Sequence, residues 1–339
     1  MATQLELRRR VRSVRNIRQI TRAMKMVAGA KLRRAQERIM NTRPFSNKVW
    51  EVLNDLAERT ERRDHPLLRE VQEEGRIIAV VVTSDRGMCG SFNANVLRRA
   101  VIALRAWEGK DVSLVVVGKI GSKYMRKQKW PVIASYPDYL MDFDFAGAAA
   151  VAQDLIEKFT AHEADAVYLI YNEFKSLMQQ TVVVDRLLPI VGIRFPKDEG
   201  LTARDAMRAV AEVNTGGAPD LAGFGAIGLS GMASAWADSK EAADEAGKFE
   251  ALDLVDFIYD PSVAEIFERT LPRHVEIQTY RAFLESVAAE HAARRAAMDN
   301  ATRNADDLID DLTLTMNKIR QADITTEILE VVGGAEALK

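Results

Sequence analysis

The 339-residue chain contains very little cysteine and histidine, and neither type is clustered. Cys89 is the single cysteine, which excludes an internal disulfide and any zinc site built from several thiolates of this chain. The four histidines are scattered singly, and no group of His, Asp and Glu has the spacing of metal ligands. We therefore expect a protein of a reducing compartment, without a metal site or a cofactor.

Long apolar runs are also missing. No stretch approaches 18 uninterrupted apolar residues, and Met1 is followed by polar and basic residues rather than by the apolar core of a signal peptide. The sequence thus predicts neither a membrane span nor secretion, and at most a position beside a membrane. The hydrophobic content of 47% is nevertheless sufficient for a packed core.

The small formal net charge of −2 conceals a strong difference between the two ends of the chain. Residues 1–39 carry twelve Lys or Arg against two acidic residues, whereas residues 298–339 carry nine acidic residues against four bases. The two ends are therefore electrostatic complements, and we expect them to attract each other.

Apolar residues at both ends recur at steps of three and four, which gathers them on one stripe of a helix. The N-terminal stripe consists of Val11, Val14, Ile17, Ile20 or Thr21, Met24, Val27 or Ala28, Leu32, Ala35 and Ile39. The C-terminal stripe consists of Met298, Ala301, Ala305, Leu308, Leu312, Met316, Ile319, Ile328 and Val331. A mitochondrial transit peptide, which has a similar Arg-rich composition, does not need so long a stripe. Residues 1–60 and 271–339 are therefore predicted to form an antiparallel coiled coil.

Residues 61–270 show a different pattern, in which short β-branched runs alternate with helical stretches. Strand-like runs occupy residues 77–83, 112–117, 167–171 and 181–184, and helical patterns occupy residues 93–107, 119–128 and 146–160. This alternation predicts an α/β domain with a mostly parallel sheet that is covered on both faces. Residues 190–252 hold nine of the nineteen glycines and indicate an insertion within this domain.

Three blocks of residues resemble one family, in the order and at the spacing of that family. The first block is ITRAMKMVA at residues 20–28 with AKLRRAQ at residues 30–36, and the second is TSDRG at residues 83–87 with Cys89, Gly90 and Asn93. The third block contains Asn317, Lys318, Arg320, Gln321, Ile324, Thr325 and Glu327, followed by Gly333 and Ala335. Together they resemble the γ subunit of F-type rotary ATP synthases over the whole chain except the insertion.

This resemblance implies a coiled coil that projects from a Rossmann-like α/β domain. It also implies a central rotor shaft that couples ion-driven rotation of a membrane c-ring to ATP synthesis or hydrolysis, without catalysing a reaction itself. The implied partners are three α and three β subunits, the ε subunit and the c-ring. The implied location is peripheral, at the cytoplasmic face of a bacterial plasma (inner) membrane.

The resemblance also assigns partner contacts to residues of both terminal helices. Basic residues of the first helix are expected to face the acidic catch region of the β subunits, and polar residues of the last helix are expected to hydrogen-bond a β-subunit catch loop. The candidates are Lys25, Arg33 and Arg34 in the first helix and Arg320, Gln321 and Thr325 in the last. Offsets of four and five residues place the last three on one side of their helix.

The loop after the first predicted strand is interpreted as structural, with a secondary possibility that Asp85, Arg86 and Cys89 face the ε subunit or the c-ring. Neither a dinucleotide fingerprint nor a Walker lysine motif occurs in the chain, and Cys89 has no evident base beside it. A nucleotide-binding enzyme is therefore the more distant alternative. A nucleic-acid-binding or scaffold protein with a helical hairpin arm is the nearer one, although the basic helix lacks interleaved aromatic residues.

Two features depart from the family pattern. Gly29 stands where the family usually has alanine, which costs the helix up to about 1 kcal/mol unless close packing requires the missing methyl group. The insertion at residues 190–252 contains no cysteine, which excludes the redox switch that chloroplast relatives build on a cysteine pair nearby.

Overall fold

The computed structural model describes residues 4–59, 65–69, 71, 74–140, 144–177, 179–193, 259–260 and 262–337. The insertion expected at residues 190–252 lies, beyond residue 193, outside the described residues. No helix of the described part is both long enough and apolar enough to cross a membrane.

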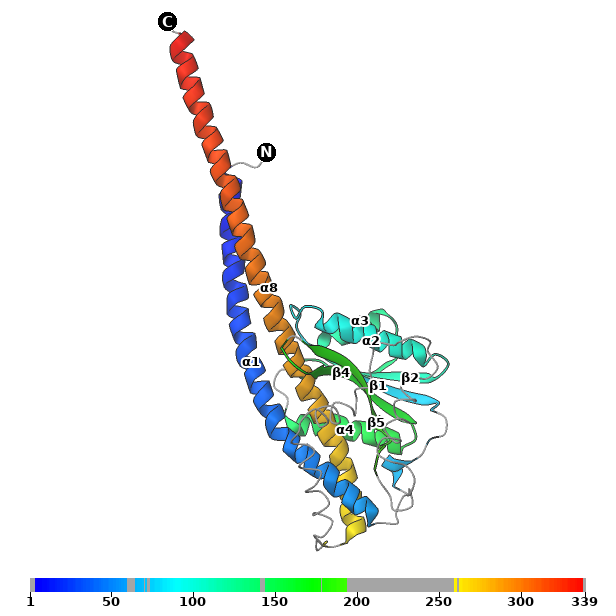
Figure 1. Cartoon of the computed structure of the whole chain (residues 1–339). Coiled ribbons are helices and arrows are strands. Elements are labelled where there is room, and N and C mark those ends of the chain that lie inside the picture. The colour runs from blue at the N-terminus through cyan, green and yellow to red at the C-terminus, as the bar shows by residue number, and fades with distance from the viewer. Residues whose placement is uncertain are drawn as a thin grey trace, which may run out of the picture. The chain divides into compact units, whose positions relative to one another are not determined.

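Two long helices form the ends of the chain (Figure 1). Helix α1 spans Gln4–Glu58 and contains Pro44, and helix α8 spans Val263–Ala337 and contains Pro272. Helix α8 begins eight residues earlier than residue 271, the limit predicted from the sequence, and continues through Pro272. Phe267, Leu271 and Val275 lie one turn apart and are all buried, so their burial outweighs the hydrogen bond that the proline removes.

The middle of the chain forms a single five-stranded sheet, which confirms the predicted α/β fold. The strand order is β3-β2-β1-β4-β5, with parallel pairing throughout except for the antiparallel pair of β4 and β5. This order is that of a Rossmann-like half with an antiparallel edge strand. The sequence did not predict β3, which is short and only half-buried. The strands are β1 (Arg76–Val82), β2 (Asp111–Val117), β3 (Val132–Tyr136), β4 (Ala166–Phe174) and β5 (Gln180–Leu188).

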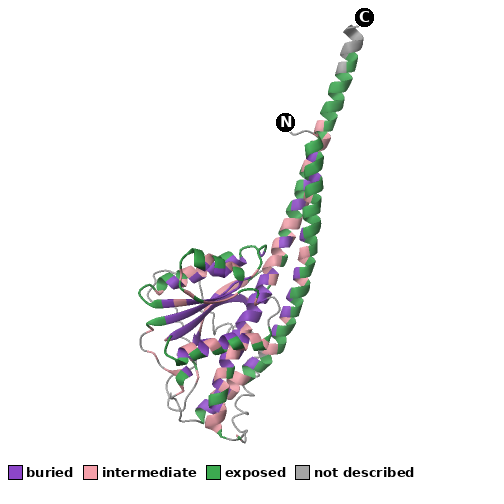
Figure 2. Ribbon diagram, turned by 180° about the vertical axis from the view of Figure 1, so that it is seen from behind, coloured by how far each residue is buried: buried purple, intermediate pink, exposed green. Residues whose placement is uncertain are grey.

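Helices cover both faces of the sheet (Figure 1). Helices α2 (Phe92–Ala106) and α3 (Lys119–Lys127) lie on one face, where Val96, Leu104 and Met125 join the alternate residues of β1, β2 and β4 in one core. Helix α4 (Phe145–Thr160) lies on the other face. The short 3-10 helix η1 (Pro66–Leu68) precedes β1. Because both faces are covered, the central strands are buried along almost their whole length (Figure 2).

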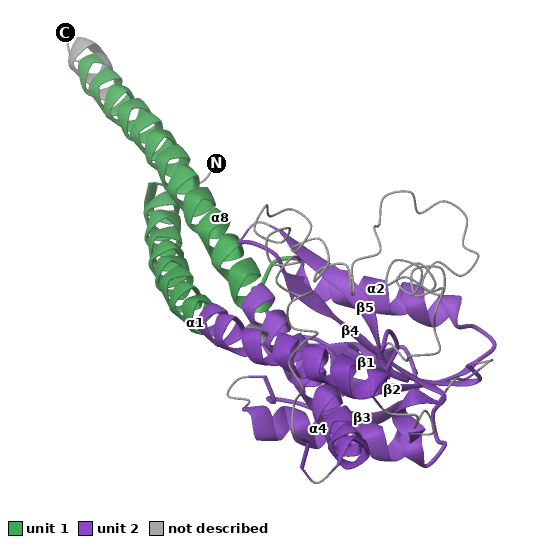
Figure 3. Ribbon diagram, turned by 60° about the horizontal axis from the view of Figure 1, so that its bottom comes forward, with its two compact units in different colours: residues 1–34, 88–90, 290–339 green, residues 35–87, 91–289 purple. Residues whose placement is uncertain are grey.

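Contacts between residues divide the chain into two compact units, which Figure 3 colours separately. Unit 1 consists of residues 1–34, 88–90 and 290–339, and unit 2 consists of residues 35–87 and 91–289. Both long helices are thus divided, and residues 263–289 of α8 belong with the sheet. There the ring of Tyr280 packs on that of Phe145, with centroids 5.4 Å apart. The predicted limits at residues 60/61 and 270/271 follow the chain pattern and remain a prediction.

Candidate functional site

The two helices of unit 1 run antiparallel in a fixed register. The guanidinium of Arg18 lies 2.7 Å from the carboxylate of Asp306, and the hydroxyl of Thr302 donates to that of Thr21 at 2.9 Å. The ammonium of Lys25 then pairs with Asp299, one turn further along both helices. Hydrogen bonds from Lys25 and Arg303 lower the pKa of Asp299. The charge complementarity of the two ends is thus realised as pairs across the helices.

The seam of α1 follows an alternation of four- and three-residue steps. Its positions are Leu7, Val11, Val14, Arg18, Thr21, Lys25, Ala28 and Leu32. This is the 3.5-residue repeat of a coiled coil, and three of its central positions are polar. The sequence interpretation had looked only for apolar residues and did not find Arg18, Asp306, Asp299 and Thr302. A strict heptad count from Leu7 would have found the positions on α1.

The sequence left two positions of the N-terminal stripe undecided between neighbouring residues, and the structure decides both. Thr21 and Ala28 are buried in the seam, whereas Ile20 and Val27 are exposed. Ile17 was also expected in the seam, and this was wrong, because its neighbour Arg18 takes the seam position and turns Ile17 outward. In the same way Ile309 is buried in α8 instead of Leu308. Unit 1 therefore exposes apolar side chains that its own seam does not use.

The last turns of α8 lie beyond the reach of α1. In the observed register, the first residue of α1, Gln4, corresponds to a position near Arg320, so later residues have no partner in α1. Every residue from 320 to 329 is accordingly exposed (Figure 2). Arg320, Gln321 and Thr325 all lie in this exposed segment, as the partner-contact prediction requires. The hydroxyl of Thr325 donates to the backbone carbonyl of Gln321, so it can only accept from a partner.

The basic residues predicted for α1 fall into two groups. Lys25 is half-buried and engaged with Asp299, so it supports the pairing of the two helices. Arg33 and Arg34 are exposed at the end of the α1 segment that belongs to unit 1. They are therefore better placed than Lys25 to reach another surface.

The loop after β1 is held by its own polar groups. Asp85 accepts hydrogen bonds from the backbone amides of Lys119 and Asp138, at 3.0 and 2.8 Å. Cys89 is only 2% exposed, whereas its neighbour Met88 and Arg86 are exposed. Met88 adopts a left-handed backbone with a φ of 61°. A partner approaching this loop would therefore meet Arg86 and Met88 before Asp85 or Cys89.

The carboxyl edge of the parallel strands, where open α/β sheets usually bind ligands, is closed by side chains of this chain. The hydroxyl of Thr83 donates to the carbonyl of Val117 and accepts from the amide of Gly121. A Cβ atom at Gly118 would lie 2.2 Å from the carbonyl oxygen of Thr83, so the backbones touch where a phosphate would have to enter. Asn93 likewise accepts from the amide of Ser84.

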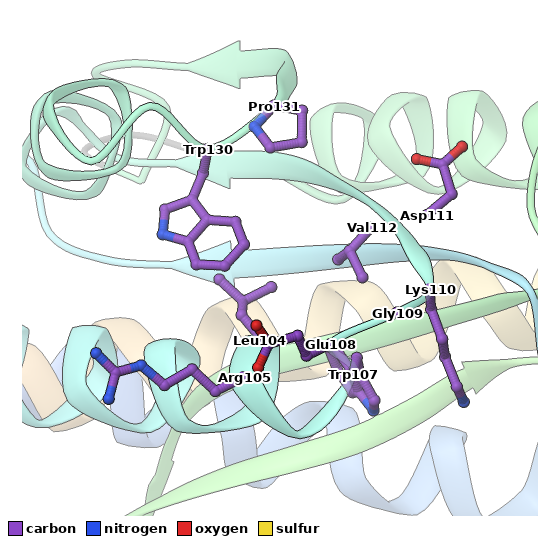
Figure 4. A pocket seen from close by; sticks show the side chains of 10 residues that line it. All are labelled: Leu104, Arg105, Trp107, Glu108, Gly109, Lys110, Asp111, Val112, Trp130 and Pro131. Atoms are coloured by element: carbon purple, nitrogen blue, oxygen red, sulfur yellow. The ribbon is translucent and has the colours of Figure 1, made fainter.

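One open pocket lies at the opposite edge, where β2 and β3 begin (Figure 4). Trp107 and Trp130 line it, and the charged side chains of Arg105, Lys110 and Asp111 point in different directions instead of converging. No nucleophile with an adjacent base lines this pocket. Among the described residues, no group of His, Cys, Asp and Glu is arranged to hold a metal ion.

These features define a class of protein: a helical hairpin with a polar, register-fixing seam and an exposed tip, in one chain with a Rossmann-like domain whose ligand-binding edge is closed by its own side chains. Comparison with known sequences gives the family. The profile described as ATP synthase matches residues 3–338. The chain is 36% identical to the ATP synthase gamma chain of Geobacter metallireducens over 100% of both chains. It is 39% identical to that of Nitratidesulfovibrio vulgaris over 97% of both.

The chain therefore belongs to the gamma chains of the ATP synthase family, as the three sequence blocks predicted. Solved structures agree on the fold. A chain from the mitochondrial ATP synthase of Euglena gracilis superposes with a TM-score of 0.58 and 20% identity, over 99% of this chain and 94% of that one. A chain from the central stalk and c-ring of the Tetrahymena thermophila enzyme gives a TM-score of 0.53 at 23% identity, over 83% of this chain and 99% of that one.

Proposed function

We propose that this chain, the central shaft of a rotary F-type ATP synthase, does no covalent chemistry and transmits rotation of the c-ring to the catalytic β subunits. The observation that carries the proposal is the exposed tip of α8, which continues past α1 with polar and apolar side chains facing outward. Such a tip needs a surrounding partner to cover Ile324, Ile328 and Leu329.

The physical basis of the coupling is differential binding. Three α and three β subunits form the ring around the shaft, and each β subunit meets a different side of it. A ligand shifts a conformational equilibrium only by its difference in affinity for the two states, and here the side of the shaft is that ligand. As the shaft turns, it favours a different nucleotide affinity in each β subunit in sequence.

On the tip, Arg320 and Gln321 are the proposed contacts with the β-subunit catch loop, with Thr325 as an acceptor. Each charge-assisted hydrogen bond contributes about 1.5–3 kcal/mol, which is enough to favour one conformation. Because there are only a few such bonds, they can break at every third of a turn. Lower on the shaft, Arg33 and Arg34 are the proposed contacts with acidic surfaces of the β subunits. Lys25 contributes mainly by holding Asp299.

The base contacts with the ε subunit and the c-ring are proposed for the loop at residues 85–89, through the exposed side chains of Arg86 and Met88. We place the protein at the cytoplasmic face of a bacterial plasma membrane, peripheral and without a span of its own. The full-length likeness to gamma chains of bacteria supports this location. Arg18 and Lys25 pair with acidic residues of α8, so this part of the basic charge of α1 has a role that needs no nucleic acid.

The test is the double variant Arg320→Ala, Gln321→Ala in the reconstituted complex. We expect lower ATP turnover and weaker coupling, with the subunit still folded and assembled, because both side chains are exposed. The matched control is Thr326→Ala, which removes an exposed polar side chain from the opposite side of the same turns. Equal turnover of the first variant and the wild type, at normal assembly, would refute the catch assignment.

A further inference from the structure

A cluster of ionisable side chains, each buried or half-buried, lies between β4, β5 and α8 within unit 2. The register pairs Leu169 with Asp185 and Tyr171 with Val183, so Asp185 and Tyr171 share one face of the sheet. The hydroxyl of Tyr171 donates to the carboxylate of Asp185 at 2.9 Å. Glu173 lies two residues further along β4, on the same face.

Helix α8 contributes two charged residues to this cluster. The Nε of Arg281 donates to Oε1 of Glu285 at 2.9 Å, and both side chains interact electrostatically with Asp185. Glu285 is only 1% exposed, and the side chain of Arg281 is 18% exposed. Lys175 is the remaining charge, with its ammonium 3.8 Å from Oε2 of Glu173.

The cluster thus holds three carboxylates against the guanidinium of Arg281 and the more distant Lys175. Oε2 of Glu173 and Oε2 of Glu285 are both buried, and neither accepts a hydrogen bond. An ionised carboxylate oxygen buried without a donor is costly, and protonation of the carboxyl group removes the charge that makes its burial costly.

The electrostatics agree with this geometry. Burial, only partly opposed by the hydrogen bond from Tyr171 and by the charge of Arg281, raises the pKa of Asp185 to about 6. Burial also raises the pKa of Glu173, and the neighbouring charge of Glu285 adds to the effect. Burial raises the pKa of Tyr171 as well, so its hydroxyl stays a donor.

We propose that Asp185 and Glu173 form a proton-linked clasp with the Arg281–Glu285 pair, which holds residues 263–289 of α8 to the β4–β5 edge most tightly when one of the two strand carboxyl groups carries a proton. Full ionisation leaves two or more negative charges against the single buried guanidinium and loosens the attachment. The segment that the clasp holds is the one through which α8 is anchored to the sheet.

The direction of the pH dependence follows from linkage. A carboxyl group whose pKa is higher in the folded state than in the unfolded state favours folding below its folded pKa, and the gain is lost as the pH rises through that value. With values of 3.8 and about 6, local opening at the clasp becomes about tenfold more favourable between pH 5 and pH 8. Buried histidines change stability in the opposite direction, so the clasp must be measured against a variant that keeps them.

The experiment is native-state hydrogen exchange of the full chain at pH 5, 6, 7 and 8, with rates corrected for the intrinsic pH dependence of exchange. Peptides of β5 and of residues 275–289 report on the clasp. We expect wild-type protection to fall about tenfold more than that of Asp185→Asn between pH 5 and pH 8. At pH 8 the variant should be the better protected of the two. The control Asp111→Asn removes an exposed carboxylate outside the cluster and should follow the wild type.

Glu173→Gln is the second variant, and it keeps the test decisive if Asp185→Asn fails to fold. It removes one negative charge and leaves the hydrogen bond between Tyr171 and Asp185 intact. We expect it to weaken the pH dependence of protection in the same peptides. If the clasp peptides of either folded variant lose protection with pH as the wild type does, the proposal is overturned.

Discussion

Units 1 and 2 solve the problem of burial in different ways. In unit 2 the strands β1, β2 and β4 are buried on both faces, and most of their side chains have almost no exposed surface. In unit 1 two helices share a single seam, and three neighbouring seam positions of α1 are the polar residues Arg18, Thr21 and Lys25. The exposed large apolar residues of unit 1 include Ile17, Ile20, Met26, Val27, Leu314 and Ile328.

The difference teaches that the two units have different requirements for partners. Unit 2 buries most of its apolar residues within itself and is stabilised by its core. Unit 1 fixes the register of its helices with polar pairs, which contribute specificity more than stability. Its outward apolar side chains are left for other surfaces. The part for which we propose the β-subunit contacts is therefore the part whose own fold is least stabilised by burial.

The same substitution in each unit gives the largest test of this comparison. Leu114 is 0% exposed in the central strand β2, and Leu32 is 2% exposed in the seam of α1. We expect Leu114→Ala to lower the free energy of unfolding by about 3–4 kcal/mol, because strands and α2 hold the cavity open. Leu32→Ala should cost about 2 kcal/mol, because two helices can close on the gap.

Urea denaturation of the full chain, followed by circular dichroism and by tryptophan fluorescence, measures both losses. The two units can unfold separately, so the effect of each variant should be strongest in the transition of its own unit. Equal losses for the two variants would show that the seam is packed as rigidly as the sheet, and the comparison would fail.

Two histidines, His274 buried and His291 half-buried, extend the comparison to pH. Burial lowers the pKa of His274, in unit 2, to about 4. Burial and the charges of Arg294 and Lys31 lower the pKa of His291, in unit 1, also to about 4. Since the unfolded value is 6.5, the stability is complete above pH 6.5 and is lost as the pH falls toward 4. At pH 5 each histidine should cost roughly 2 kcal/mol.

The concentration of salt should distinguish the effects of the two histidines on stability. The shift of His274 has burial as its cause, whereas part of the shift of His291 comes from nearby cations, which salt screens. We expect His274→Gln to remove an acid-induced loss that is the same at low and high salt. His291→Gln should remove a loss that is smaller at high salt. A salt response that is identical for the two variants would contradict the assigned causes.

Most of the fold could be predicted because it depends on local patterns. The runs at residues 77–83 and 112–117 became β1 and β2, and the long helices followed from three- and four-residue spacing. β3 was missed, because its sequence VIASY is short and mixed, as suits a half-buried edge strand. The outward turn of Ile20 could not be read from hydrophobicity, because the seam prefers the heptad position of Thr21.

The predicted contact residues could be placed, but their surroundings could not. Arg320 and Gln321 are exposed because α1 begins at Gln4, which corresponds to a position near Arg320, so α8 continues from there without a partner helix. A sequence pattern locates the start of a helix only to within a few residues. The pairing of Lys25 with Asp299 joins residues far apart in the chain, and only the register of the two helices brings them together. The carboxylates of β4, β5 and α8 are likewise brought together only by the tertiary structure, so no local sequence pattern could predict their cluster.

Gly29 tests how closely the helices of unit 1 approach each other. A Cβ atom added there would lie 3.8 Å from the side chain of Arg295, which is an ordinary contact, so close packing does not require glycine. We expect Gly29→Ala to stabilise unit 1 by about 1 kcal/mol through helix propensity. Thermal unfolding measures the change, and Gly87→Ala, in a loop with open space, is the control outside the helix. Destabilisation by Gly29→Ala would reveal a tighter seam.

The smallest expected effect is that of the pair Lys25 and Asp299 in the polar centre of the seam. Both side chains reach solvent, so their mutual attraction is weak and screened, and its use is to set the register rather than to add stability. A double-mutant cycle with Lys25→Ala and Asp299→Ala should give a favourable coupling at low salt that fades above about 0.5 M. The matched cycle with Arg18→Ala and Asp306→Ala should fade in the same way. A coupling that persists at high salt would mean that the pair is dry, and unit 1 would then resemble the core of unit 2 more than a surface held in register.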